Sequence, residues 1–203
     1  DVYKRQELDG IGETQVESIK NFFSEEINTK ITQNLINQLV VNNYSIKNIN
    51  KLSYLFFYWY LTYCLKSSKQ KKIKNISKKE LTQVYKKLYF KNTVFVHRDF
   101  HASNIMVNKN KLGLIDSQDA IIGNPLYDLA SLIDDVRIKL PSNLQERLFN
   151  FYYSKSKLKK EQYKNLKNDF EILSVQRNLK ILGIFVRLFK RDGKPDYLKY
   201  LPY

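Results

Sequence analysis

The chain has 203 residues, 43% of them hydrophobic, and a formal net charge of +15. This length and composition suffice for one globular domain with a sizeable core. They exclude a fold built on disulfide bonds, because Cys64 is the single cysteine. We expect Cys64 to be a packed thiol in a hydrophobic helix, in a reducing, cytoplasmic environment.

The helical segments follow from the spacing of apolar residues. Residues 52–65 are predicted to form a buried helix that is too short and too polar to span a membrane. The lysine-rich stretch 66–75 is predicted to be a polar loop, because its charges would repel one another if folded tightly. Apolar residues recur every three or four positions in four later segments, which predicts helices at 79–89, 127–138, 143–153 and 160–190, the last with a break or a bend.

Short runs with strand character surround the central loop of the chain. Residues 94–96 precede the loop, residues 105–107 follow it, and a turn at 108–110 leads into residues 112–115. The last two strands therefore form a β-hairpin, and Asp116 stands at its end.

Three polar residues in this region have the types that phosphoryl transfer requires. That reaction needs an oriented hydroxyl and cations over the phosphate oxygens more than it needs covalent help from the protein. Asp99 lies in a His-x-Asp motif, and Asn104 follows it by five residues. We interpret Asp99 as the base that accepts the proton of the substrate hydroxyl. Asn104 and Asp116 are interpreted as ligands of a magnesium ion that bridges the β- and γ-phosphates of ATP.

Five neighbouring residues have either a structural role or a role that the sequence leaves open. His97 is expected to brace the loop by hydrogen bonds rather than to transfer protons, since the hydroxyl already has its base. Arg98 and His101 either contact phosphate or substrate or are simply solvated, and both readings stay open. Asp119 either meets a polar substrate or a second ion, or is a turn residue. Asp128 is interpreted as structural, because a carboxylate is favoured near the start of the helix that begins there.

These motifs resemble the aminoglycoside phosphotransferase (APH) and choline kinase group, which shares the protein-kinase fold. Within that group, residues 116–129 are similar to the bacterial anomeric N-acetylmuramate/N-acetylglucosamine kinases of cell-wall recycling, and so is a second block, 176–198. The similarity covers about residues 92–203. One departure is Ser117, where members of the group generally carry an aromatic residue, a loss of packing that leaves Asp116 intact.

The resemblance implies an α+β, protein-kinase-like fold with a mostly helical C-terminal lobe and a catalytic-loop hairpin. Residues 92–203 would form the APH-like catalytic core and C-terminal helices, and residues 1–91 a helical N-terminal part of the same structural domain. The resemblance also implies ATP with Mg²⁺ and a sugar phosphorylated at its anomeric hydroxyl. An aminoglycoside or choline-type kinase, or a non-catalytic binding module, remains an alternative.

A complete enzyme of this fold has a small lobe with a Gly-rich loop over the phosphates and a strand lysine. Before residue 92 the only glycines are Gly10 and Gly12, and no strand pattern precedes them. Residues 1–6 resemble sequence read through from outside a native gene. We therefore expect a fragment without its N-terminal lobe, with little or no activity by itself.

The net charge of +15 raises the question of nucleic-acid binding. The Lys and Arg residues are scattered along the chain, and no zinc-finger spacing, RNP motif or Gly-x-x-Gly clamp accompanies them. We expect no dedicated nucleic-acid partner; part of the charge would instead help to attract ATP or an anionic sugar. The sequence does not determine the oligomeric state.

Overall fold

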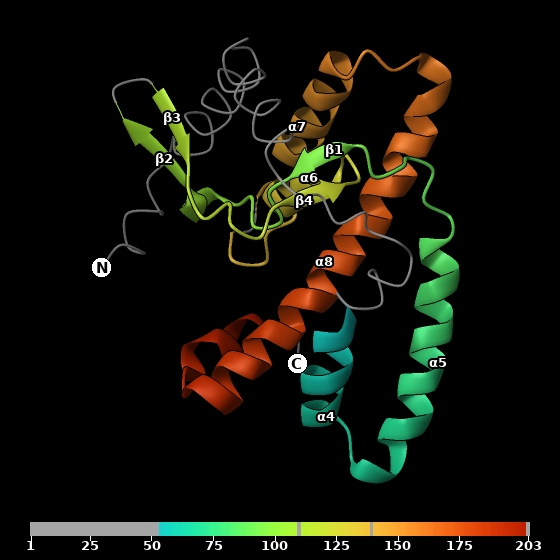
Figure 1. Cartoon of the computed structure of the whole chain (residues 1–203), viewed down its shortest axis with the longest axis vertical. Helices are drawn as coiled ribbons and strands as arrows, with labels where there is room; N and C mark the ends of the chain where they lie inside the picture. Colours follow the sequence, from blue (N-terminus) through green and yellow to red (C-terminus); the bar gives the residue numbers. More distant parts are fainter. Residues whose placement is uncertain (1–52, 109–110, 139, 202–203) are drawn as a thin grey trace.

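The structure is a computed structural model that describes residues 53–108, 111–138 and 140–201. The expectations for Gly10, Gly12 and residues 1–6 lie outside these residues. The described part is mostly helical, with two small sheets and one long helix, α8 (Figure 1). The named helices are α4 (Leu61–Cys64), α5 (Ser67–Tyr85), α6 (Tyr127–Ile133), α7 (Ser142–Lys155) and α8 (Tyr163–Asp192), and the strands are β1 (Val94–Val96), β2 (Ile105–Asn108), β3 (Lys111–Leu114) and β4 (Ile121–Gly123).

The predicted hairpin is confirmed, and the structure adds a strand pair that the sequence did not predict. β2 pairs antiparallel with β3, from Ile105 opposite Leu114 to the end of the hairpin. β1 pairs antiparallel with β4 in a separate sheet. β4 was missed because its sequence, Ile-Ile-Gly, includes a glycine, which is depleted in strands, and the strand is recognised only by its pairing with β1. Gly123 lets the two strands approach closely, since a Cβ there would lie 2.9 Å from Cγ2 of Val96.

Helix α8 is 30 residues long and packs against several of the other described elements. Its first half packs on α6 and α7, and buried Leu166 and Leu173 share a core with Leu126 and Phe149. Of the break or bend predicted within 160–190, the break is wrong: a short 3₁₀ turn at Lys160–Gln162 precedes one unbroken helix. Continuous burial of its apolar face against successive partners explains why the helix does not break.

The second half of α8 packs on the segment at residues 53–64. This segment is a π-helical turn, Phe56–Tyr60, followed by α4. Gly183 makes the crossing possible, because a Cβ there would lie 2.3 Å from the carbonyl carbon of Leu55. The predicted packed thiol is wrong: Cys64 is the last residue of α4 and is exposed, whereas Leu61 faces the core.

The predicted loop at 66–75 is also wrong, because α5 begins at Ser67 and continues to Tyr85. The sequence reading overestimated charge repulsion: lysine is a good helix former, and lysines such as Lys71 and Lys72 project into solvent. Ile73 and Leu81 pack on the aromatic cluster that contains Phe57. This apolar stripe stabilises the helix. The helix ends at Tyr85 rather than at residue 89, and the backbone N–H of Tyr89 donates instead to Asp169 of α8.

Helix α6 is shorter than predicted and ends at Ile133 rather than at residue 138. The next residue, Asp134, leaves the helical conformation and accepts hydrogen bonds from Ser174 and Asn178 of α8. These tertiary contacts outweigh the apolar periodicity that predicted a longer helix. The predicted helix 143–153 is confirmed as α7, which is slightly longer.

Candidate active site

The candidate catalytic loop connects β1 to β2, and the buried side chains of Phe100 and His97 anchor it. Phe100 is buried and packs against Leu132 of α6, with Leu114 of the hairpin beside it. His97 is only 1% exposed, and its Nε2 lies 2.9 Å from the carbonyl oxygen of Ile115. Because a carbonyl oxygen only accepts, Nε2 donates this bond. His97 thereby links the loop to the end of the hairpin by a hydrogen bond, which suits the expected role of stabilising the loop.

Asp128, in the first turn of α6, holds the backbone of the loop. Its carboxylate accepts hydrogen bonds from the backbone N–H groups of His97, at 2.6 Å, and Arg98, at 3.0 Å. These bonds secure Arg98 in a left-handed conformation with φ of 74°, which a non-glycine residue adopts only when its surroundings compensate. Burial raises the pKa of Asp128 to about 6, although the two N–H donors lower it.

Hydrogen bonds bring the three proposed catalytic residues into one region. The Asn104 Nδ2 donates to the Asp99 carbonyl oxygen at 2.9 Å. The backbone N–H of Ile115 donates to the backbone carbonyl oxygen of Asn104 at 3.1 Å. Asp116 directly follows Ile115 and is therefore close to Asn104. Asp116 itself is exposed, has φ of 69°, and accepts a 2.6 Å hydrogen bond from Gln118. The loop and the hairpin end thus present their polar groups together.

The oxygen atoms of Asn104 and Asp116 suit a magnesium ion. The Asn104 amide nitrogen is already used within the loop, which leaves its side-chain oxygen as the ligand atom. Mg²⁺ prefers oxygen ligands and often takes only one or two from the protein, with water and substrate phosphates completing the octahedron. In the described residues no three His, Cys, Asp or Glu side chains form a metal-binding cluster. Two oxygen ligands of this kind suit an ion whose other ligands are water and phosphate oxygens.

Helix α8 contributes two buried cations to this region, which the sequence analysis missed. Lys180 is 8% exposed and its Nζ lies 3.5 Å from Oδ1 of Asp99. Arg177, one turn earlier, is 4% exposed and donates to the carbonyl oxygen of Asp134. Burial lowers the pKa of both side chains, while the charge of Asp99 raises that of Lys180. Cations within an apolar helix face were the signal in the sequence that could have found them.

His101 and Arg137 form a second polar cluster beside the loop. Arg137 pairs with the Asp135 carboxylate at 2.8 Å, and its Nη1 lies 3.3 Å from Nε2 of His101. Since the guanidinium only donates, Nε2 is the acceptor and the ring is neutral. Burial, and next the charge of Arg137, lower the pKa of His101 to about 4. The geometry gives His101 a partner within the protein, so it is not simply solvated.

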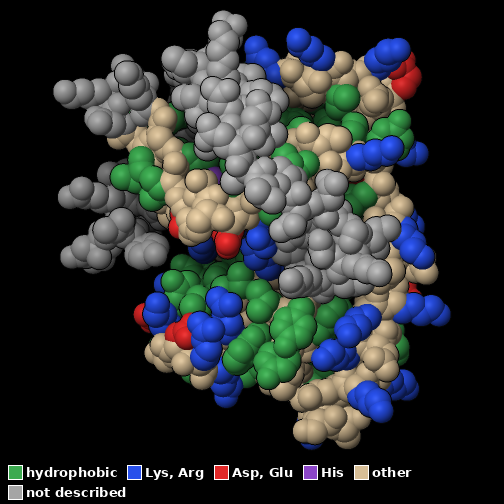
Figure 2. Space-filling view, viewed as in Figure 1, with side chains coloured by type: hydrophobic (Ala, Val, Ile, Leu, Met, Phe, Trp, Pro, Cys, Tyr) green, Lys and Arg blue, Asp and Glu red, His purple; other side chains and the backbone are tan. Residues whose placement is uncertain are grey.

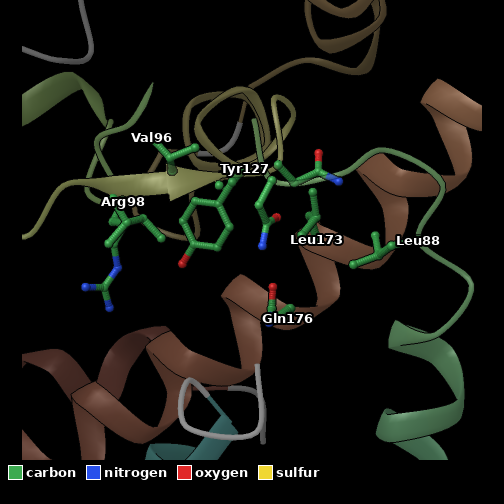
Figure 3. A pocket seen from close by; sticks show the side chains of 10 residues that line it. Leu88, Val96, Arg98, Tyr127, Leu173 and Gln176 are labelled. Atoms are coloured by element: carbon green, nitrogen blue, oxygen red, sulfur yellow. The ribbon is translucent and has the colours of Figure 1, made fainter. Parts of the chain in front are cut away.

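A small cavity of about 30 Å³ lies beneath the loop (Figure 3). Its lining includes the polar side chains of Arg98, Tyr127 and Gln176. The Tyr127 hydroxyl and the Gln176 Nε2 are buried and have no hydrogen-bond partner among the described residues. Burial raises the pKa of Tyr127 to about 12, so the hydroxyl keeps its proton. A polar space of this size accommodates a bridging water.

Arg98 and Asp119 meet at the loop that follows Asp116. Nη1 of Arg98 donates to the carbonyl oxygen of Asp119 at 3.2 Å. The N–H of Ala120 donates to the carbonyl oxygen of Ser117 at 3.0 Å, which closes a turn around Asp119. The Asp119 side chain is exposed. Asp119 is thus a turn residue whose carboxylate is accessible to a ligand.

With this geometry established, comparison with known proteins defines the class of the chain. Residues 59–161 match the model of APH, the phosphotransferase enzyme family. The match covers half of the chain and includes Asp99, Asn104 and Asp116. The chain therefore belongs to the APH phosphotransferase family.

Curated relatives narrow the comparison within the family. Proteins named "N-acetylmuramate/N-acetylglucosamine kinase" match from Neisseria meningitidis at 38% identity and from Pseudomonas aeruginosa at 36%, each over 113 residues or 54% of this chain. The relative from Caulobacter vibrioides is 33% identical over 116 residues. The resemblance stated from the motifs is confirmed. The matched segment spans 34% of the Neisseria relative and 33% of the Pseudomonas one, about a third of their length.

Positive charge is distributed widely over the described residues. Figure 2 shows their Lys and Arg side chains spread over one face of the molecule. None of the described helices combines the length and the apolar character needed to cross a membrane.

Proposed function

We propose that the protein transfers the γ-phosphoryl group of ATP to the anomeric hydroxyl of an amino sugar, N-acetylmuramate or N-acetylglucosamine. The observation that carries this proposal is the pair of hydrogen bonds that join Asn104 to Asp99 and the hairpin end beside Asp116 to Asn104. The names of the curated relatives supply the acceptor class. Residues 92–203 are proposed to be the catalytic core.

Asp99 is proposed to orient the acceptor hydroxyl and to accept its proton. Its side chain is 40% exposed, so a substrate can reach it. Its backbone is fixed, because its carbonyl oxygen accepts hydrogen bonds from the Asn104 amide and from the His101 N–H. A base on a fixed backbone increases the fraction of acceptor molecules held in line with the phosphorus atom.

Asn104 and Asp116 are proposed to hold magnesium beside this base. When bound, the ion neutralises charge on the β- and γ-phosphate oxygens of ATP. Asp116 is kept at the end of β3 by its left-handed backbone and by Gln118. His97 and Asp128 maintain the loop from beneath through backbone contacts and do not take part in proton transfer.

The proposal is tested with the protein expressed from its complete reading frame. ADP release should depend on MgATP together with N-acetylmuramate or N-acetylglucosamine, and phosphate should appear on the anomeric oxygen by ³¹P NMR. Kanamycin and choline serve as control acceptors. Turnover with kanamycin or choline but not with the amino sugars would contradict an amino-sugar acceptor. MgATP binding without turnover on any acceptor would favour a binding module.

The role of Asp99 is tested separately. Asp99→Ala should abolish turnover, by at least about 1,000-fold, while MgATP binding is retained, because the base does not contact the nucleotide. Isothermal titration calorimetry and a coupled ADP assay measure the two quantities. Retention of most activity would contradict the assignment.

A further inference from the structure

The side chain of Lys180 is placed unusually for a lysine. It projects from α8 into the protein, where it is 11% exposed, and its Nζ lies 3.5 Å from Oδ1 of Asp99. Asp99 is its only hydrogen-bond or ion-pair partner among the residues that the structure describes. A buried ammonium with a single partner at this distance recovers little of its desolvation cost. An apolar residue would pack α8 at least as well, so the lysine is not explained by folding.

The other end of this contact is the candidate base. Loop hydrogen bonds fix the Asp99 backbone, but they leave the torsions of its side chain unrestricted. Lys180 provides the one side-chain contact to the carboxylate in the described part of the chain, and it touches Oδ1 only. Oδ2 remains as the oxygen that can accept a proton from an acceptor hydroxyl. Burial disfavours the charged amine and Asp99 favours it, so the ammonium depends on this carboxylate.

We infer that Lys180 is a positioning residue for Asp99: it holds Oδ1 and thereby directs Oδ2 to the acceptor hydroxyl. This inference rests on the proposed function, because it assigns Lys180 a role in that same reaction. The long helix α8 thus does more than support the core, since it brings a residue 81 positions further along the chain to the base.

The test compares substitutions of two lysines on α8. Lys180→Met keeps the length of the side chain and removes its charge, and Lys180→Arg restores the charge. Lys164→Met is the matched control, because it makes the same change at an exposed position of the same helix. Each variant is prepared from the complete reading frame, and kcat and KM are measured for MgATP and for the acceptor.

Lys180→Met should lower kcat by about 100-fold, the loss expected when a reacting group is misplaced by about an ångström. Both KM values should stay within about twofold of wild type, because the lysine acts through Asp99. Lys180→Arg should recover at least about tenfold of the loss, and Lys164→Met should match wild type. A kcat for Lys180→Met within about threefold of wild type would overturn the inference, as would a rise in acceptor KM alone.

A double-mutant cycle separates positioning from general support of the fold. With Asp99→Asn in place, Lys180→Met should cause no further loss of kcat, because the group that it positions has gone. A further loss of about 100-fold would show an independent role and overturn the inference. Full activity of Asp99→Asn alone would instead disprove the proposed base, so failure of the two proposals can be distinguished.

Thermal unfolding of the same four proteins gives a readout that needs no turnover. Asp99→Asn should lower the midpoint in the wild-type background, because it leaves Lys180 buried without its partner, and should leave it unchanged in the Lys180→Met background. Equal shifts in both backgrounds would mean that the two side chains are not coupled, which would also overturn the inference. If Lys180→Met does not fold, Lys180→Gln takes its place in both cycles.

Discussion

Two sets of carboxylates in this protein illustrate two uses of the same chemical group. Asp99, Asp116 and Asp119 have accessible carboxylates on the catalytic loop and the hairpin end. Asp128 and Asp169 instead bind backbone N–H groups inside the protein: Asp128 those of the loop, and Asp169 those of Tyr89 and Phe90. Asp128 fixes the backbone just before Asp99, and Asp169 fixes the chain that leads into β1. We expect substitutions in the first set to change activity and those in the second to change stability.

After Asp99→Ala, the largest effect is expected at Asp116. Asp116→Asn should lower kcat by about 100-fold or more and raise the magnesium concentration needed for half-maximal rate, because an amide oxygen is a weaker ligand than a carboxylate. The unfolding midpoint should not change, since the side chain is exposed and Asn tolerates the positive φ. A magnesium titration of the rate measures both effects. An unchanged titration would argue against metal binding at Asp116.

Asp169 should show the opposite behaviour. It is fully buried and accepts hydrogen bonds from Tyr89 N, Phe90 N and the side chain of Asn124. Asp169→Asn places an amide against these donors and should cost about 3 kcal/mol in the free energy of unfolding, measured in urea.

Glu171→Gln is the control for Asp169, because it makes the same chemical change at an exposed position of α8. It should change the free energy of unfolding by less than about 0.5 kcal/mol. A cost below about 1 kcal/mol at Asp169 would show that the buried hydrogen bonds are replaced by water.

Asp128 gives a pH-dependent version of the comparison. Burial raises the folded-state pKa of Asp128 to about 6, above its unfolded value, so the folded protein binds the proton more tightly. The protonated Asp128 side chain therefore adds to the free energy of unfolding. Measured against Asp128→Asn, this contribution should be complete below about pH 4 and should disappear as the pH rises through 6. The loss is on the order of 3 kcal/mol. Urea unfolding of both proteins between pH 4 and 7.5 measures it; a contribution that grows with pH would mean that the N–H donors outweigh burial.

The smallest effect concerns a contact without charge. Gly183→Ala would place a Cβ 2.3 Å from the Leu55 carbonyl carbon, so α8 must move away from residues 53–64. We expect a loss of about 2 kcal/mol in urea unfolding. Gly113→Ala is the control, since its nearest contact outside its neighbours is at 3.9 Å, and it should cost less than about 1 kcal/mol. Equal costs at the two positions would contradict the close helix crossing.

Local patterns predicted a large part of this fold. The hairpin 105–114 and helix α7 follow from short-range alternation and spacing, and both are present. The errors fall where distant residues decide. α5 replaced a predicted loop because Ile73 and Leu81 pack on a distant aromatic cluster, and α6 stopped early because Asp134 bonds to α8.

The candidate site shows the same division. Asp99, Asn104 and Asp116 were recognisable because they lie within one short motif, and the hairpin accounts for their proximity. Lys180 was missed because it is distant in sequence from the loop and is one of several lysines in its helix. Its burial, which depends on how α8 packs against the loop, is what distinguishes it from an exposed lysine such as Lys164.

The sequence by itself determined the family and the order of the polar groups along the catalytic loop, because both depend on residue type and short spacing. Only the tertiary structure decided which carboxylates face solvent and which hold the backbone. It also decided that a lysine from α8 reaches Asp99. The physical reason is that desolvation and hydrogen-bond partners depend on the packing of elements that are remote in the chain.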